Sequence, residues 1–238
     1  MANRKILLGL TTITLGEWKN KVKEIDELGL KEIALFPTSL NLSERKELYS
    51  LLEKTKLEKI PHVHLRDDMF IPELDYLSSK YKTEVFNVHS EDDHYPSLLD
   101  YKDYYKKIYV ENTINNTPTE NDLKKYAGLC FDFAHWHSGI MKAGEACERN
   151  IALKAYAKKY KIGINHIGAI KKEKILYHDR RINKDFFGYD SHWLDDLSEL
   201  DYIKKYKDYF ADIISIELEN SLKRQLEVKQ YLEKIINS

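Results

Sequence analysis

Histidines and carboxylates stand at the ends of short apolar runs along this chain. All nine histidines lie between residues 62 and 192. Runs stop at His64, His89, His135, His166 and His192, and two more end in the carboxylates Glu111 and Glu217. Imidazole and carboxylate groups are ligands for divalent zinc, manganese or iron. Strands ending in such groups would gather them on one rim of a sheet or barrel, so the pattern predicts a metal site.

The run Lys59–Leu65 offers two histidines. His62 and His64 are two positions apart, which places both side chains on one face of a strand. One buried structural histidine and one surface histidine would be an equally ordinary explanation, so which of the two is a ligand stays open. His89 ends the following run, and it becomes a candidate ligand only in combination with the others.

Three carboxylates end strands that look buried. Glu111 closes an otherwise apolar run, where an ionised carboxylate is unfavourable unless a cation or hydrogen bonds compensate it. Asp132 is similar, and the spacing Asp132-x-x-His135 lets a strand-end carboxylate and an imidazole from the following loop converge. Glu217 and Glu219 share one face of the last run. Glu217 is the preferred ligand because it lies deeper in that run and parallels Glu111.

Two further candidates come from the last third of the chain. His166 interrupts a run apolar enough to be buried, so its imidazole needs a partner. Asp190-x-His192 has a spacing at which a loop often presents two ligands to one ion. Each candidate alone has a structural explanation. Together they give a His, Asp or Glu at the carboxyl end of six consecutive predicted strands.

The elements that position these groups alternate between short β-type runs and helical patterns. The predicted strands are Lys5–Thr11, Glu32–Pro37, Lys59–Leu65, Glu84–His89, Ile108–Glu111, Leu129–Phe133, Ile162–Ile167 and Asp212–Leu218. Such repeated units imply a parallel sheet covered by helices. Eight units in this length predict a single-domain α/β protein, a (β/α)8 TIM barrel over residues 1–238, with its site at the carboxyl ends of the strands. An open doubly wound sheet is the alternative, but no Gly-x-Gly-x-x-Gly follows the first strand.

Residues 171–200 form a long polar and aromatic stretch between the last two predicted strands, and we expect a loop there. Loops of this length in compact domains are usually functional or disordered, and the aromatic content argues against disorder. Arg180 and Arg181 in this stretch, together with Arg66 and the Lys171-Lys172 pair, are candidate ligands for a substrate phosphate.

The composition restricts the function classes. In the 238 residues, 38 Lys and Arg balance 39 Asp and Glu for a net charge of −1, so nucleic acid is a less favoured partner. Cys130 and Cys147 are too few for a disulfide framework, which favours a reducing cytoplasm. The N-terminus lacks the features of a signal peptide, and no apolar run is long enough to span a membrane, so no membrane partner is expected.

On these residues the chain resembles the xylose isomerase-like barrel superfamily over essentially its full length. That superfamily includes sugar isomerases, sugar-phosphate epimerases and the endonuclease IV family. The isomerase and epimerase branch holds one manganese-type ion with four strand-end ligands. The resemblance implies that the matching ligands here are Glu111, Asp132, His166 and Glu217.

The endonuclease IV branch holds three zinc ions with a larger set. The resemblance implies that this set is His62 or His64, His89, Glu111, Asp132, His135, His166, Asp190, His192 and Glu217. All nine ligand types of that branch therefore have a candidate in this chain. The long stretch before Asp190 and the lack of positive charge depart from the pattern of a DNA-repair enzyme.

Two enzyme classes follow from the resemblance. The preferred one is a divalent-metal-dependent isomerase or epimerase of a sugar or sugar phosphate, in which Glu111 and Glu217 move protons. Its substrate contacts would come from His64, Arg66, His135, Arg180 and Arg181. The alternative is a multinuclear metal-dependent phosphoesterase. One to three Mn or Zn ions fit these classes, a homo-oligomer is compatible with both, and a barrel that only binds a ligand is the third possibility.

Overall fold

The computed structural model describes residues 4–13, 17–90, 101–179 and 184–237. Nine parallel strands form one sheet in the order β1-β11-β8-β7-β6-β5-β4-β3-β2. Their bounds are β1 Lys5–Leu7, β2 Gly9–Thr11, β3 Glu32–Phe36, β4 Lys59–His64, β5 Val85–His89, β6 Ile108–Glu111, β7 Gly128–Asp132, β8 Ile162–Ile167 and β11 Ile213–Ile216. Because β1 and β2 are two halves of one extended segment, the sheet closes on itself. The predicted (β/α)8 barrel is confirmed.

The closure depends on how the first strand divides at Leu8. β1 pairs with β11, whereas β2 pairs with β3. At Gly9 the backbone N–H donates to Gln225 Oε1 at 2.7 Å, and Gln225 Nε2 donates to the Gly9 carbonyl at 3.0 Å. A side chain at Gly9 would meet the Ile216 carbonyl at 2.0 Å, so only glycine fits against β11 here. We refer to this contact between Gly9 and Gln225 as the barrel seam.

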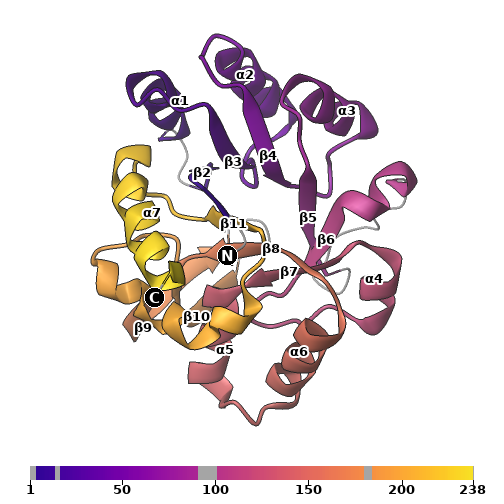
Figure 1. Cartoon of the computed structure of the whole chain (residues 1–238), viewed down its shortest axis with the longest axis vertical. Coiled ribbons are helices and arrows are strands. Elements are labelled where there is room, and N and C mark those ends of the chain that lie inside the picture. Colours follow the sequence, from indigo (N-terminus) through magenta and orange to yellow (C-terminus); the bar gives the residue numbers. More distant parts are fainter. Residues whose placement is uncertain (1–3, 14–16, 91–100, 180–183, 238) are drawn as a thin grey trace.

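Helices surround the strands, as Figure 1 shows down the short axis of the molecule. The helices are α1 Trp18–Glu27, α2 Leu42–Leu52, α3 Ile71–Lys80, α4 Glu120–Lys125, α5 Phe133–Ala143, α6 Glu148–Lys159 and α7 Leu222–Asn237, with 3-10 segments η1 Lys102–Lys107 and η2 Leu197–Tyr209. Strand residues alternate between the two sides of the barrel wall. Leu8 and Leu10 belong to the core shared with α1 and α2, while Leu7 packs with Phe36 inside the barrel. The interior therefore has its own small apolar layers.

The stretch 171–200 is not the loop that the sequence predicted. β9 (Ala169–Asp179) and β10 (Lys184–Ser191) pair as an antiparallel hairpin with an irregularity between Gly188 and Asp190. Isoleucines and aromatic residues in this stretch favour extended structure, and each strand supplies the other's hydrogen bonds. The loop interpretation was wrong because these residues lack the clean alternation of apolar and polar types that marks a strand in the sequence.

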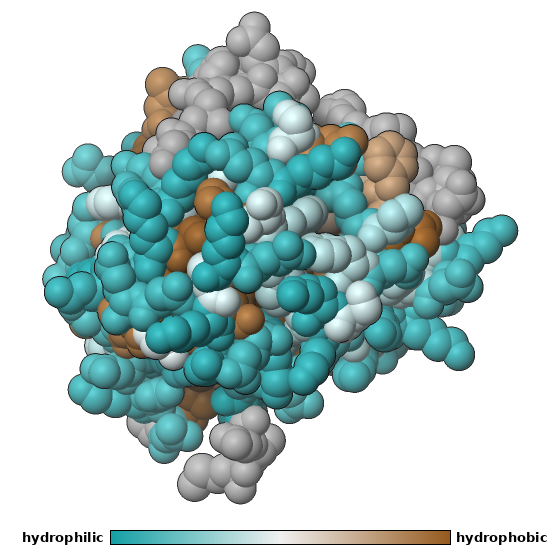
Figure 2. Space-filling model, turned by 90° about the horizontal axis from the view of Figure 1, so that it is seen from above, coloured by the Kyte–Doolittle hydropathy of each residue, from teal (hydrophilic) through white to brown (hydrophobic). Residues whose placement is uncertain are grey.

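The surface shows no broad apolar face in the view of Figure 2. Hydrophilic side chains dominate this face, and apolar side chains form small scattered groups. Among the described residues, no helix is long and apolar enough to cross a membrane.

Candidate metal centre

The first group of candidate ligands lies where β6, β7, β8 and β11 end. Glu111, Asp132, His166 and Glu217 are buried and place donor atoms within 4.8 Å of one another. The Nδ1 atom of His166 lies 3.2 Å from Glu111 Oε1, 3.0 Å from Glu217 Oε2 and 3.8 Å from Asp132 Oδ2. The structure thus brings together the four residues that the isomerase branch of the resemblance implied.

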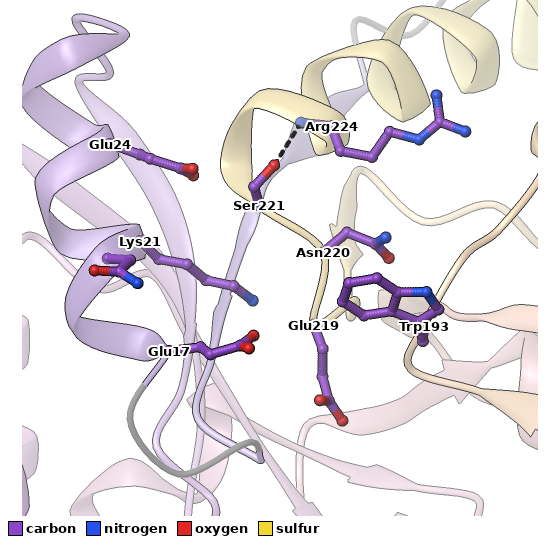
Figure 3. A pocket seen from close by; sticks show the side chains of 9 residues that line it. Glu17, Lys21, Glu24, Trp193, Glu219, Asn220, Ser221 and Arg224 are labelled. Atoms are coloured by element: carbon purple, nitrogen blue, oxygen red, sulfur yellow. Dashed lines mark hydrogen bonds between the residues drawn. The ribbon is translucent and has the colours of Figure 1, made fainter.

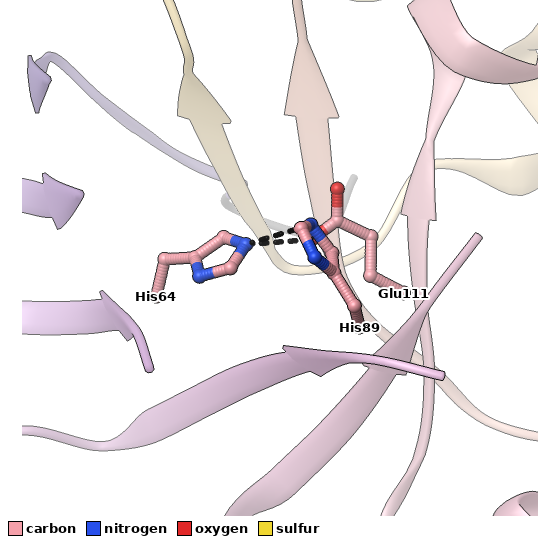
Figure 4. Close-up of side chains that lie close together, drawn as sticks. All are labelled: His64, His89 and Glu111. Atoms are coloured by element: carbon pink, nitrogen blue, oxygen red, sulfur yellow. Dashed lines mark hydrogen bonds and ion pairs between the residues drawn. The ribbon is translucent and has the colours of Figure 1, made fainter. Parts of the chain in front are cut away.

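A second group shares Glu111 and is drawn in Figure 4. His64 Nε2 lies 3.1 Å from Glu111 Oε2 and 3.3 Å from His89 Nε2, and His89 Nε2 lies 3.9 Å from the same oxygen. Asn87 Nδ2 donates to Glu111 Oε2 at 2.5 Å. Glu111 therefore directs Oε1 to the first group and Oε2 to the second, which is the arrangement of a bridging carboxylate.

His135, Asp190 and His192 lie beside these groups. His135 Nδ1 contacts Asp190 Oδ2 at 3.1 Å, and the rings of His135 and His192 lie 6.3 Å apart. Asp132 Oδ1 accepts from the backbone N–H of His135 at 2.6 Å, so this carboxylate begins α5 while its other oxygen faces the first group. His192 Nδ1 lies 4.0 Å from Glu217 Oε1. These three residues face the same site but form a looser group.

The structure separates the two histidines of β4. His62 is fully buried, with Nδ1 2.8 Å from Ser215 Oγ and Nε2 2.7 Å from Asn87 Oδ1. Both of its ring nitrogens are therefore engaged below the site, and burial lowers the pKa of His62 to about 3. His64, one layer nearer the rim, is the histidine that lies among the candidate ligands.

The acidic and basic side chains of the site change each other's pKa. Burial would raise the pKa of Glu111, but the neighbouring His166 lowers it well below its ordinary value. Burial raises the pKa of Asp132 to about 6. Against the effect of burial, Asp132 and Asp190 raise the pKa of His135 to about 10. Protonated imidazoles thus compensate the carboxylates, and a divalent cation would replace those protons.

Several buried polar atoms at the site have no hydrogen-bond partner, and they show whether a metal ion fits there. Among the residues that the structure describes, His166 Nδ1 and Nε2, Glu217 Oε2 and Asp190 Oδ1 are buried without a hydrogen bond. Such atoms are destabilising unless something binds them. The imidazole and carboxylate donors match zinc and manganese. The residues present therefore fit a divalent ion.

The basic candidates for substrate binding have other partners. Arg66 Nε donates to Asp68 at 2.9 Å, and Nη1 contacts the Thr38 carbonyl. Lys171 pairs with both Asp195 and Glu199 at 2.8 Å. Arg180 and Arg181 lie outside the described residues. Of the three candidates whose side chains are described, Arg66 and Lys171 are thus paired with carboxylates, and Lys172 is exposed.

Three interior residues were missed by the sequence reasoning. Asn87, Cys130 and Ser215 each precede a candidate strand-end ligand by two positions and share its inward face. Asn87 links His62 to Glu111, and Ser215 holds His62. Counting back two positions from each ligand would have found all three.

A pocket of about 400 Å³ opens beside the centre, between α1 and the segment joining β11 to α7 (Figure 3). Glu219 and Trp193, the near neighbours of Glu217 and His192 in sequence, line it. Lys21 Nζ donates to Thr11 Oγ1 at 2.7 Å and to the Leu218 carbonyl at 2.9 Å. Glu219 thus belongs to this pocket rather than to either of the two groups that share Glu111.

These features define a parallel (β/α)8 barrel with a buried candidate metal centre at its carboxyl rim. No protein-family model matches the sequence, and no curated protein matches it. A similar solved structure is a xylose isomerase-like TIM barrel protein from Mycobacterium smegmatis in complex with magnesium. It has 10% identity, a TM-score of 0.48, and 98% coverage of both chains. That protein carries the superfamily name that the strand-end residues suggested here.

Proposed function

We propose that this chain is a multinuclear metal-dependent phosphoesterase. The position of Glu111 carries the proposal, because its two oxygens lie in two different ligand groups. An enzyme with one ion needs only Glu111, Asp132, His166 and Glu217. In such an enzyme His64 would contact substrate, and the group that His64 and His89 form with the same carboxylate would hold no ion of its own.

In this proposal each side of Glu111 holds one ion. The first ion would be held by Glu111, Asp132, His166 and Glu217. The second ion would be held by His64, His89 and Glu111. A third ion would be held by His135, Asp190 and His192. When bound, paired ions of this kind polarise the oxygens of a phosphate ester and lower the pKa of water. The ions would also supply the positive charge that Arg66 and Lys171 do not offer.

The protein contributes orientation of the ligands. Asn87 fixes Glu111 through its 2.5 Å hydrogen bond, and the α5 N-terminus fixes Asp132. Such outer contacts hold ligands in the geometry that an ion requires. The Lys21 and Trp193 pocket is lined by Trp193 and Glu219, which lie close in sequence to the candidate ligands His192 and Glu217, and the organic part of a phosphate ester would extend into it.

A sugar or sugar-phosphate isomerase or epimerase is the second candidate. It is favoured by the near-neutral charge of the chain, which gives little overall attraction for a nucleic acid, and by the pairing of Arg66 and Lys171 with carboxylates. Here Glu111 and Glu217 would act as the acid and base on the substrate carbon. The four-ligand group is complete for this chemistry on its own.

The double variant His64→Ala/His89→Ala separates the two candidates. The phosphoesterase proposal expects loss of one metal equivalent by elemental analysis and loss of hydrolysis of bis(4-nitrophenyl) phosphate. Unchanged metal content in the variant would support the isomerase instead, together with incorporation of deuterium from D2O into a sugar phosphate substrate. A thermal melt of the variant checks folding, and Asp190→Ala/His192→Ala tests the third ion in the same way.

A further inference from the structure

Cys130 lies inside the barrel directly below the candidate ligands. It is on β7, two positions before Asp132, and it is fully buried. In the strand register it stands opposite Glu111 of β6 and Ile164 of β8. Alternation along β7 therefore gives Cys130 and Asp132 the same inward direction, one layer apart.

The thiol is within reach of two of the candidate ligands. Cys130, Glu111 and His166 each place one donor atom so that the three lie within 4.8 Å of one another. His166 is fully buried, and neither of its ring nitrogens has a hydrogen-bond partner. An unsatisfied imidazole next to a thiol and a carboxylate is a donor set of N, S and O, which is typical of sites for softer divalent cations.

We infer that Cys130 is an additional sulfur ligand of this centre, and that Cys130, Glu111 and His166 together hold thiophilic cations such as zinc, cobalt or cadmium. The inference rests on the proposed metal centre. On binding, the sulfur–metal bond forms as the thiol proton leaves to solvent, and no electron is transferred. The side chain thereby selects the class of ion.

The same geometry would make the centre discriminate between cations. Magnesium and manganese prefer oxygen ligands, whereas thiolates favour zinc and softer ions. A cation that moves toward Cys130 keeps Glu111 and His166 as ligands. The position beside Cys130 therefore extends the first group of ligands and is not a separate site.

The test uses the full-length protein, stripped of metal and titrated with Co²⁺ and with Cd²⁺. The chain has two cysteines, so Cys147→Ser leaves Cys130 as the sole thiol. We expect a sulfur-to-metal charge-transfer absorption in the wild type and in Cys147→Ser. We expect its loss in Cys130→Ser and Cys130→Ala, with about one proton fewer released per ion bound.

The outcomes distinguish this inference from the proposed function. Binding of Co²⁺ and Cd²⁺ without charge-transfer absorption in Cys147→Ser overturns the role of Cys130 and leaves the centre intact. Absence of any binding overturns the metal centre itself. Because the Cys147→Ser result needs no change at the buried position, a folding defect in the Cys130 variants does not obscure the answer.

Discussion

Two clusters of buried charge in this protein are built very differently. Around Arg45, which is fully buried, every guanidinium nitrogen has a partner. Nε and Nη2 donate to Glu73 at 2.9 and 2.8 Å, and Nη1 donates to Asp68 and to the Leu40 carbonyl at 3.0 Å. At the candidate metal centre, His166 and one oxygen each of Glu217 and Asp190 are buried without hydrogen bonds.

Whether the hydrogen bonds are complete separates structural charges from functional ones in this protein. A buried ion pair with all its hydrogen bonds formed has a structural role, and removing one partner is strongly destabilising because the other charge is left uncompensated. A buried cluster with unsatisfied donors and acceptors is unfavourable until a ligand binds it. We therefore expect substitutions in the two clusters to affect different properties.

The largest effect is expected at the satisfied cluster. Arg45→Ala leaves Glu73 and Asp68 without their partner and should lower the free energy of unfolding by about 3–5 kcal/mol. Denaturant titration measures this change. Tyr49→Phe, which removes one hydrogen bond to Glu73, is the control and should cost about 1 kcal/mol. A small effect of Arg45→Ala would contradict the structural role of this cluster.

The next effect concerns the shared carboxylate. Glu111→Gln should weaken metal binding by more than about 100-fold, because loss of outer contacts alone costs 10–100-fold. Equilibrium dialysis with elemental analysis measures the affinity, and a melt of the metal-free variant should show little loss of stability. Glu219→Gln, at the neighbouring pocket, should leave affinity unchanged. If Glu219→Gln were the change that weakened metal binding, the ligand after the last strand would be Glu219 rather than Glu217.

Removal of metal should affect stability through the candidate metal centre and not through the Arg45 cluster. An ion present at 100 times its dissociation constant stabilises the native state by about 2.7 kcal/mol. Chelation should thus lower the melting midpoint by about 5–11 °C in a chain of this size. The same shift should occur in the Tyr49→Phe protein. No shift, together with no metal in the untreated sample, would rule out the centre.

The smallest effect is expected from an outer contact. Asn87→Ala removes the hydrogen bond to Glu111 and should reduce metal affinity about 10-fold. Asn150→Ala, which deletes a buried hydrogen bond to the Gly144 carbonyl away from the centre, is the matched control for stability. Equal affinity in the two variants would mean that Asn87 does not position Glu111.

The barrel and most of its rim could be predicted because parallel strands carry a strong local signal. Apolar runs such as Ile108–Val110 need burial on both faces, and their carboxyl ends share one rim. The choice between His62 and His64 could not be made, because alternation gives both residues the same face. Their depth depends on the register with β5, which places His62 beside Val85 and His64 beside Asn87.

Other features depend on contacts that are distant in sequence. Arg66 contacts the Thr38 carbonyl and Asp68. The contact with Thr38 could not be predicted, because the two residues are distant in sequence. The hairpin of β9 and β10 was missed because its residues lack a clean alternation between apolar and polar types. The bridging position of Glu111 required coordinates, since it depends on where each oxygen points.

The barrel seam also has a consequence for how the protein is made. Gly9 and Gln225 are 216 positions apart, so the first strand has no partner on its β11 side until the end of the chain is synthesised. At about 5–20 residues per second, translation leaves that edge unpaired for roughly 10–40 s. An open strand edge pairs readily with other chains. The first strand of the nascent chain therefore keeps an open edge until β11 and Gln225 have been synthesised.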